Sequence, residues 1–489
     1  MDLAQLPVCS ELFHTASGTA YADLVIDGHR ETWPIRSRRC RAFLRHSYYR
    51  AAGTAASASI INGAIDQLEA RAQFDGPERV VHLRVAEHDG ALYLDLADDR
   101  WRAVEVTPTG WQVISSPPVR FRRPPGLLPL PAPQRGGSII ALQSLLNLSS
   151  YDDFILVIAW LLAALRPTGP YPLLALAGEQ GSAKTVTCKL LKALIDPGIA
   201  PVRTAPREER ELMIAANSAH MLAFDNVSGL PAWLSDALCR IASGGSLAVR
   251  QLYTDDAEVL FESARPILLN GIEDIIVRPD LADRAIILTL PPISDEQRRP
   301  EAELKSDFDR LRPGISGALL DVVAHGLTRR SDMHLTSLPR MADFALWSAA
   351  CETALWPAGT IARAYRANRQ AILEGVIEAD PVAACVRDLM ASRNHWAGTA
   401  SDFLQAVDKL QRQDALIRRP DWPRTPRALA GRLRRAQTSL RAMGIDIAFH
   451  REGREGSKII RMRGPASEPP VSSATSAPAK QDLETEPPA

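Results

Sequence analysis

One segment restricts the possible folds more than any other, because it joins a strand, a glycine-rich loop and a helix. Residues 173–195 are LLALAGEQGSAKTVTCKLLKALI, in which Leu173–Ala177 form an apolar run and Leu190, Leu191 and Leu194 share one helical side. Between them lies GEQGSAKT, one residue away from the pattern G-x-x-x-x-G-K-[ST]. In that pattern small residues let backbone N–H groups surround a phosphate, and the following helix points its positive end toward it. The segment therefore predicts a nucleotide-binding α/β domain.

The predicted nucleotide contacts come from the whole loop. They are Gly178, Glu179, Gln180, Gly181, Ser182, Ala183, Lys184 and Thr185. We expect Lys184 to reach the β- and γ-phosphates of ATP and the Thr185 hydroxyl to ligate Mg²⁺. Ala183 departs from the pattern. Because a methyl group in the left-handed region costs about 1–2 kcal/mol, we expect the backbone at Ala183 to avoid that region.

A second strand-like run, HMLAFDN, follows about forty residues downstream and ends at Asp225 and Asn226. We expect Asp225 to hold Mg²⁺, usually through water. Asn226 can position a water molecule but cannot accept its proton. The catalytic base therefore stays open between Asp225, Glu208 and Glu209.

The next segment predicts a β-hairpin and two further polar positions. LAVRQLY and AEVLFE alternate around a predicted tip at Thr254-Asp255-Asp256, and ARPILLNG is another apolar strand ending at Asn270. Asn270 is interpreted as a contact to the γ-phosphate or to the attacking water, or as a simple turn residue before glycine. Arg278 and Arg284 show no evident partner in their own chain. We favour Arg284 as an arginine offered to the nucleotide of a neighbouring subunit.

The order of these elements, from Gly178 to about Pro292, resembles the AAA+ ATPases. More narrowly it resembles the superfamily 3 helicase modules of primase-helicases in phages, large DNA viruses and integrated mobile elements. The segments that carry the resemblance are GEQGSAKT, AFDN, ALCRIASGGSLAVRQLY, LLNG and DLADR, about a quarter of the chain. The resemblance implies a homo-oligomeric ring with a hairpin, bearing Arg250 and Tyr253, that tracks single-stranded DNA in a central channel. Ala183 and Asn226 depart from the pattern, which puts the rate of catalysis in doubt.

The remaining chain predicts further domains around this P-loop NTPase core of AAA+ or superfamily 3 type. They are an α+β N-terminal domain (1–120), a Pro-rich linker or strap (121–137), the core (138–295), a helical lid region (296–375), a winged-helix-like DNA-binding domain (381–463) and a disordered tail (464–489).

The C-terminal region is locally basic, although the whole chain has no net charge. Between Arg418 and Arg463 twelve Arg and one Lys face four acids. A helix starting near Pro426, followed by the alternating runs IDIAFH and KIIRMR, is typical of a winged helix. The arginines expected on or near its recognition helix are Arg424, Arg427, Arg432, Arg434 and Arg435, of which Arg424 lies just before the helix. Such a surface suits duplex DNA, although a solvated basic face on a packing domain is the alternative.

The N-terminal region mixes seven arginines with Trp33, Phe43, Tyr48 and Tyr49 in residues 28–50. Two interpretations fit this mixture equally well: a surface that binds single-stranded nucleic acid, and a helix that packs its aromatic residues inward. The region shows neither a D-x-D pair nor zinc-ribbon cysteines, so primase chemistry is not supported.

Composition is ordinary for a cytoplasmic enzyme of several domains, which is the location we expect. The six cysteines form no C-x-x-C pair and predict free thiols. The strongest apolar run, FILVIAWLLAAL at 154–165, is shorter than the roughly twenty residues of a bilayer span and predicts a buried helix. We also expect no N-terminal leader.

Three functions fit these features. The leading hypothesis is an ATP-dependent DNA helicase or translocase that serves replication of a mobile element or phage-like replicon. The alternatives are an ATPase that loads or remodels without unwinding, and a DNA-binding regulator in which ATP acts as a switch.

Overall fold

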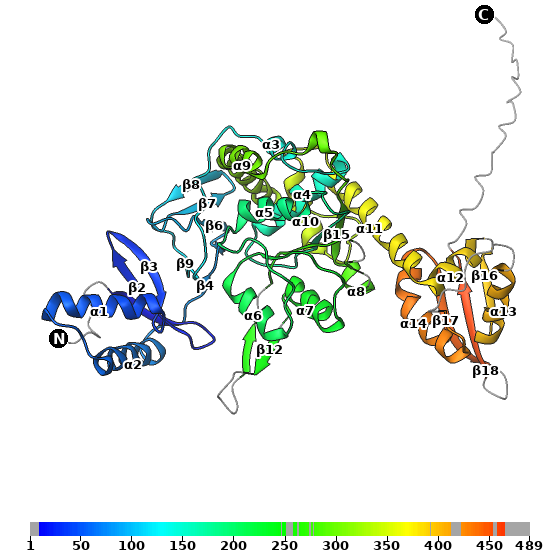
Figure 1. The fold of residues 1–489 in the computed structure, drawn as a ribbon, viewed down its shortest axis with the longest axis horizontal. Helices are drawn as coiled ribbons and strands as arrows, with labels where there is room; N and C mark the ends of the chain where they lie inside the picture. Colours follow the sequence, from blue (N-terminus) through cyan, green and yellow to red (C-terminus); the bar gives the residue numbers. More distant parts are fainter. Residues whose placement is uncertain are drawn as a thin grey trace, which may run out of the picture. The chain divides into compact units, whose positions relative to one another are not determined.

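The structure is a computed structural model in which contacts divide the chain into two units, Met1–Ile372 and Leu373–Ala489 (Figure 1). It describes residues 9–245, 247–250, 258–261, 264–272, 275–276, 278–391, 393–411, 422–452 and 457–464. Tyr253, the predicted hairpin tip at Thr254-Asp255-Asp256 and all but the first residue of the predicted tail lie outside these ranges.

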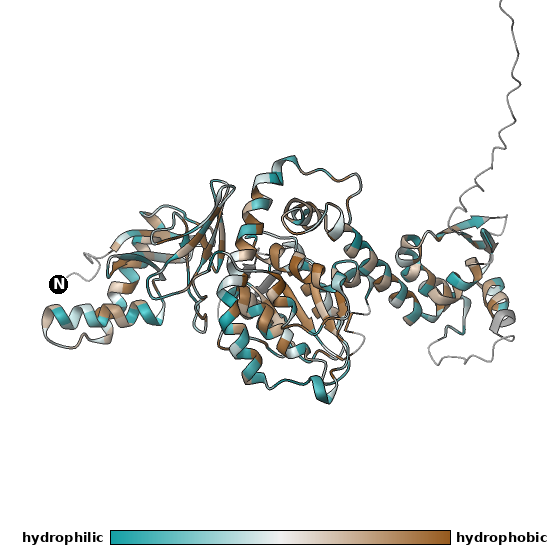
Figure 2. Cartoon of the chain, turned by 90° about the horizontal axis from the view of Figure 1, so that it is seen from above, coloured by the Kyte–Doolittle hydropathy of each residue, from teal (hydrophilic) through white to brown (hydrophobic). Residues whose placement is uncertain are grey.

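A four-stranded parallel sheet forms the centre of the first unit. Its strands are β10 (Leu173–Ala177), β11 (Leu222–Phe224), β14 (Ile267–Asn270) and β15 (Ala285–Thr289), in the order β11-β14-β10-β15. These runs are almost continuously apolar because both faces of a parallel sheet are covered. In Figure 2 the interior strands of this unit are coloured hydrophobic, whereas hydrophilic colours lie on outer helical faces. The α/β character predicted for this region is confirmed.

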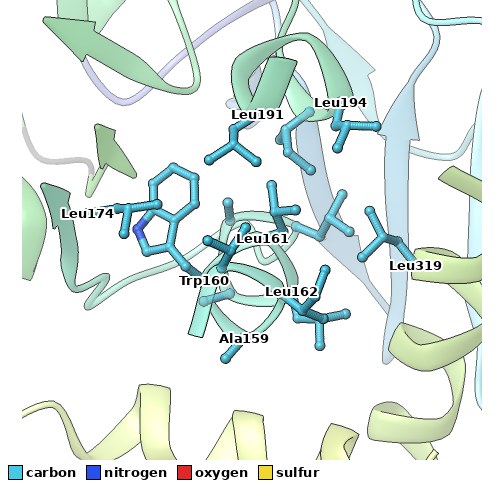
Figure 3. Packing of buried hydrophobic residues seen from close by; sticks show 14 of the residues in the cluster. Ala159, Trp160, Leu161, Leu162, Leu174, Leu191, Leu194 and Leu319 are labelled. Carbon is cyan, nitrogen blue, oxygen red and sulfur yellow. The ribbon is translucent and has the colours of Figure 1, made fainter. Parts of the chain in front are cut away.

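Helix α4 (Tyr151–Ala164) is the most deeply buried helix segment of this unit's core. Ser150 caps it by accepting a hydrogen bond from the Asp153 amide, and every residue from Phe154 to Ala164 is buried. Leu174 of β10, together with Leu191 and Leu194 of α5 (Lys184–Ile195), surrounds it in Figure 3. The interpretation of the apolar run as a buried helix, not a membrane span, fits this packing.

The first unit contains further helices, which continue into the region predicted to be helical. They are α3 (Ile140–Gln143), α6 (Glu209–Ser218), α7 (Ala232–Ser243), α8 (Pro279–Ala282), η1 (Asp295–Gln297), α9 (Glu301–Arg329), η2 (Arg330–Asp332) and α10 (Ala342–Glu352). Helix α11 (Thr360–Ala379) crosses the division between the two units.

Residues 9–74 form a small α+β substructure with its own hydrophobic cluster. Antiparallel strands β1 (Cys9–His14), β2 (Ala20–Ile26) and β3 (His29–Pro34) pack with α1 (Arg38–Ala52) and α2 (Ala58–Phe74).

The aromatic residues of this substructure mostly face its interior. Trp33 is buried, donates its indole N–H to Glu31 at 2.8 Å, and meets the Phe43 ring edge-on. Arg39 stacks on Trp33 at 4.5 Å, whereas Tyr49 is 59% exposed. The structure therefore favours the inward-packing interpretation over a stacking platform for bases.

A second sheet packs onto the main core. It consists of β5 (Val85–His88), β6 (Ala91–Asp95), β7 (Ala103–Thr107) and β8 (Gly110–Ile114), paired antiparallel in chain order. A short parallel pair, β4 (Val81–His82) with β9 (Arg120–Phe121), flanks it. Trp111 donates its indole N–H to Asp321 of α9 at 2.8 Å, which ties this sheet to the helices.

The Pro-rich segment runs along the first unit as an extended strap. The Leu128 amide donates to Pro197 O at 3.0 Å and the Gln134 amide donates to Pro313 O at 2.9 Å. A Cβ on Gly317 would lie 1.9 Å from Gln134 O, so only glycine permits this approach of strap and helix. The domain boundaries expected from the sequence stay predictions, because packing alone does not say which parts fold independently.

The second unit combines helices with a three-stranded antiparallel sheet. Its elements are α12 (Pro381–Ala391), β16 (His395–Gly398), α13 (Ala400–Gln411), α14 (Pro426–Ala442), β17 (Asp446–Glu452) and β18 (Ser457–Arg463). Thr425 caps α14 by accepting from the Ala428 amide, and Leu429, Leu433 and Leu440 are fully buried. Strand β16, which was not predicted from the sequence, pairs with β18.

The cysteines are all free thiols, as their spacing predicts. None of the helices in the described part of the chain combines the length and apolar character of a bilayer span.

Shortening a side chain in the α4 core tests this packing. Leu161 is fully buried, so we expect Leu161→Ala to destabilise the first unit by about 2–5 kcal/mol. Ile140→Ala is the control, because Ile140 is 52% exposed and its truncation should change the free energy of unfolding by less than about 0.5 kcal/mol. Urea denaturation followed by tryptophan fluorescence measures both, and equal effects would contradict the assignment of α4 to the core.

Candidate functional site

The glycine-rich loop leaves the carboxyl end of β10 and turns back into α5. Gly178 has φ 142° and Gly181 has φ 84°, backbone conformations that glycine adopts without a Cβ penalty. A Cβ on Gly178 would lie 2.6 Å from Leu290 O, so the loop passes very close to the end of β15. Ser182 is fully buried and donates its hydroxyl to Glu179 O at 2.9 Å, which closes the loop.

Ala183 contradicts our expectation that its backbone avoids the left-handed region. It has φ 64° and ψ 23°, and it precedes the first residue of α5 without a side-chain cap. Ala183 is the last residue of the turn that leads from β10 into α5, and the chain passes through a positive φ there directly before Lys184. The methyl group is therefore held in a conformation that costs about 1–2 kcal/mol.

Lys184 bends back over the loop and satisfies the carbonyl groups there. Its Nζ donates to Gly178 O at 2.8 Å, to Glu179 O at 2.6 Å and to the Ser182 hydroxyl at 3.2 Å. Burial lowers the pKa of Lys184, and the nearby Asp225 carboxylate opposes this effect. The ammonium group is thus placed inside the loop, where an anion surrounded by the loop would meet it.

Thr185 and Asp225 meet although forty positions separate them in the sequence. The Thr185 hydroxyl donates to Asp225 Oδ1 at 2.9 Å. Two oxygen ligands, one of them a carboxylate, suit Mg²⁺, which keeps several waters and takes its other ligands from phosphates. No group of three or more His, Cys, Asp or Glu within the described ranges could hold a metal by itself. The pair therefore fits a metal ion that arrives together with a nucleotide.

Asn270 connects the ends of three elements. Its Oδ1 accepts from the Asn226 amide at 2.9 Å, and its Nδ2 donates to the Cys188 thiol of α5 at 3.2 Å. Asn270 is 1% exposed, and burial raises the pKa of Cys188 to about 12, so this thiol stays protonated. In this conformation Asn270 supports the loop after β11. It therefore does more than the simple turn residue that the sequence left as an alternative.

Asn226 itself lies at the surface of the site. Its backbone N–H is engaged with Asn270, whereas its side chain is exposed, so the side-chain amide can meet solvent. Of the other residues considered as a catalytic base, Glu209 forms an ion pair with Arg240 at 3.3 Å. Five of the predicted site residues therefore gather at the carboxyl edge of the sheet: Lys184, Thr185, Asp225, Asn226 and Asn270.

Arg284 does not join them. Its carbonyl accepts from the Leu173 amide at the start of β10, the opposite end of a strand that is roughly 15 Å long. Its Nη1 donates to Asp280 O at 2.8 Å, and Arg278 pairs with Asp236 at 2.9 Å. Both arginines therefore do have partners in their own chain, contrary to our expectation. The placement of Arg284 excludes contact with the loop of the same chain.

Asn147, a functional-site residue that was not predicted from the sequence, supports the loop from outside. Its Nδ2 donates to Ser182 O at 3.2 Å and to Pro291 O at 2.7 Å, so it bridges the loop and the segment after β15. It lies outside any recognisable motif, and no pattern in the sequence could have identified it.

The predicted hairpin is present in its described strands. Strand β12 (Leu247–Arg250) pairs antiparallel with β13 (Glu258–Phe261), and Arg250 is opposite Glu258. Arg250 is the last residue of β12, next to the undescribed residues that include Tyr253.

The second unit has a basic hollow of about 880 Å³ where two helix N-termini meet a hairpin. Thr399 and Ser401 lie at the start of α13, Pro426 lies at the start of α14, and β17 and β18 form the third wall. Its charged and titratable lining residues are Arg427, Arg434, His450, Arg451 and Lys458, with no acid among the lining residues. Helix N-termini add positive potential, so the hollow suits a polyanion.

The arginines predicted for DNA are not equivalent. Arg434 stacks on Phe449 at 4.7 Å, which holds its guanidinium on the hairpin side of α14. Arg432 instead pairs with Asp380 at 3.6 Å, and Arg435 lies in a separate shallow hollow around Thr425 and Gly431. Arg427 lines both hollows.

These features define a mixed α/β protein with a glycine-rich loop and a threonine–aspartate pair at the carboxyl edge of a parallel sheet. A family model described as the actinomycete integrative conjugative element replication protein matches residues 139–374. A second model, described as the C-terminal domain of the same RepA protein, matches residues 382–478. Together they match about two thirds of the chain, which therefore belongs to this family of replication proteins. The resemblance to proteins of integrated mobile elements is confirmed.

Solved structures show weaker likenesses. The A-form apo structure of the NrS-1 C-terminal region has 11% sequence identity and a TM-score of 0.42, covering 93% of this chain and 96% of that chain. The SCCmec type IV Cch structure, titled an active helicase, has 12% identity and a TM-score of 0.45, covering 93% of both chains. No curated protein matches the chain.

Replacing Ala183 by glycine should relieve the strained loop. The removed penalty of about 1–2 kcal/mol exceeds the entropy that glycine adds to the unfolded chain, about 0.4–1 kcal/mol, so Ala183→Gly should stabilise the first unit slightly. Ala193→Gly, within the regular part of α5, should instead destabilise it by about 0.5–1 kcal/mol. Thermal unfolding compares the two, and a loss of stability in both would refute the strain at Ala183.

Proposed function

We propose that the chain is an ATP-dependent DNA helicase or translocase with an AAA+ or superfamily 3-like P-loop core, which serves replication of its mobile element. The observation that carries this proposal is the convergence of the Lys184 ammonium, the Thr185–Asp225 pair and Asn270 at the glycine-rich loop. The family supplies the context of replication. We propose that the protein works in the cytoplasm as a homo-oligomeric ring.

The residues of the site would act on ATP in separate ways. Lys184 exchanges the carbonyl groups of Gly178 and Glu179 for phosphate oxygens, a stronger charge-assisted contact. Thr185 and Asp225 would hold Mg²⁺, which when bound would supply positive charge to the phosphates. Asn226, at the exposed end of β11, orients the attacking water without accepting its proton.

Arg284 would complete the site from a neighbouring subunit. It lies at the end of β10 remote from the loop of its own chain and is half-buried beside Asp280, so its guanidinium is held rather than free to swing. An arginine supplied in trans raises the rate of such reactions by roughly 10³–10⁵. Hydrolysis would then depend on ring assembly, and the β12–β13 hairpin with Arg250 and Tyr253 would contact single-stranded DNA in the channel.

The C-terminal unit would contact DNA in a different way, as a winged-helix-like domain that binds a duplex. The support is the basic hollow, in which Arg427 and Arg434 of α14 face Arg451 and Lys458 of the hairpin. Arg435, at the hollow around Thr425, extends this surface, whereas Arg432 is engaged with Asp380.

ATP hydrolysis tests the motor. We expect wild-type turnover to rise when single-stranded DNA is added, and Lys184→Ala to lower it about 100-fold, the typical cost of removing a charge-stabilising donor. Lys305→Ala is the control. The Lys305 side chain is exposed, so its removal should leave turnover unchanged.

The result separates the candidate functions. Wild-type protein without turnover under any condition would exclude the motor, and slow turnover indifferent to DNA would favour the switch. Stimulation by DNA without strand separation would favour the loader. Unaltered turnover in Lys184→Ala would remove the nucleotide assignment of the loop.

Salt dependence of duplex binding tests the basic hollow. For the full chain, we expect the double variant Arg427→Ala/Arg434→Ala to weaken binding at every sequence and to reduce the slope of log K against log salt by about two, since each phosphate contact contributes about 0.9. Arg441→Ala is the matched control, because Arg441 is on the same helix but pairs with Asp446 at 3.0 Å. Fluorescence anisotropy measures both. Equal slopes in the two variants would place the duplex elsewhere.

A further inference from the structure

Arg298 lies against the tip of the glycine-rich loop, although no motif singles it out. A Cβ placed on Gly181 would be 3.2 Å from Arg298 Nη2 and 3.9 Å from its Cζ. The guanidinium therefore occupies the space directly beside the backbone of Gly181. Gly181 lies in the turn of the loop, three residues before Lys184.

The segment that carries Arg298 is attached to the site on both sides. Before it, Asn147 bridges Ser182 O of the loop and Pro291 O. After it, Glu301 at the start of α9 accepts from Lys189 of α5 at 2.8 Å. Because α5 begins inside the loop, both attachments lead back to the phosphate-binding element. The short helix η1 between them ends directly before Arg298.

The charge of Arg298 is only weakly compensated. It pairs with Asp295 at 3.2 Å, but the Asp295 side chain is 91% exposed and that of Arg298 is 59% exposed. Exposed pairs of this kind contribute little and exchange readily. The next residue differs, because Arg299 donates to both Glu303 and Asp307. The two adjacent arginines thus differ, because Arg299 is held by two carboxylates whereas Arg298 has one largely exposed partner and lies beside the loop.

We propose that Arg298 is a nucleotide-binding residue that acts in cis, with its guanidinium on the phosphate chain of the ATP bound by the same loop. This rests on the proposed function and adds a second cation to the site, supplied by the same chain as Lys184. A guanidinium presents its N–H groups as a planar fork that matches phosphate oxygens, which a lysine cannot reproduce.

Nucleotide affinity tests the proposal separately from turnover. The probe is the non-hydrolysable triphosphate AMP-PNP with Mg²⁺, titrated calorimetrically into the full chain. We expect Arg298→Ala to weaken binding about tenfold, and Arg298→Lys to lie between it and the wild type because it keeps the charge without the fork. Arg299→Ala is the matched control and should bind as the wild type does. Thermal unfolding of each variant without nucleotide checks that the fold is retained.

The outcomes separate this inference from the proposed function. If wild type binds AMP-PNP, Lys184→Ala does not and Arg298→Ala binds normally, the role of Arg298 is wrong while the nucleotide site stands. Normal binding together with reduced turnover in Arg298→Ala also overturns it, since the arginine would then serve another subunit. A wild-type protein that does not bind AMP-PNP overturns both.

Discussion

The backbone pairing of β10 with its two parallel neighbours is the constraint on which the candidate site depends. Leu174 is paired with Leu268 on one side and with Ile286 on the other, so the strand cannot slide or turn without breaking both ladders. All three strands run in the same direction and end together. Their end residues and following loops, where backbone groups are no longer paired within the sheet, therefore meet at one edge, which is where α/β proteins place polar chemistry.

Helix α5 transmits this constraint into the rest of the first unit because it is held at both ends. At its start, Thr185 donates to Asp225 at the end of β11. At its end, Asp196 accepts from the fully buried Arg84 at 3.1 Å and from Lys192 at 3.3 Å. Burial by itself would raise the pKa of Asp196, but the two cations hold it well below its usual range. A buried group of charges such as Arg84, Lys192 and Asp196 is costly unless every charge is paired. Only one position of α5 pairs them all, so the group specifies that position.

The sequence predicted the strand, loop and helix at 173–195 because each is a local property, set by apolar runs and by glycine spacing. It also predicted α4, the paired strands of the β12–β13 hairpin and the helix-plus-hairpin of the second unit, where caps and alternation are local as well. It failed at Ala183, whose positive φ is imposed by loop closure against β15 and not by the residue itself. It also failed to find Asn147, whose contacts are 35 and 144 residues away in the sequence.

The sequence by itself determined which chemical groups are present and their order along the chain: a phosphate-type loop, an acid, an amide, an arginine and a basic C-terminal region. Only the tertiary structure decided which of them meet. Parallel pairing brings Asp225 and Asn270 to the loop and leaves Arg284 at the other end of β10, and ion pairs engage Arg432 and Arg441 while Arg427 and Arg434 face a hollow. The reason is that hydrogen-bond register and side-chain packing join residues far apart in the chain, and no local pattern records those distances.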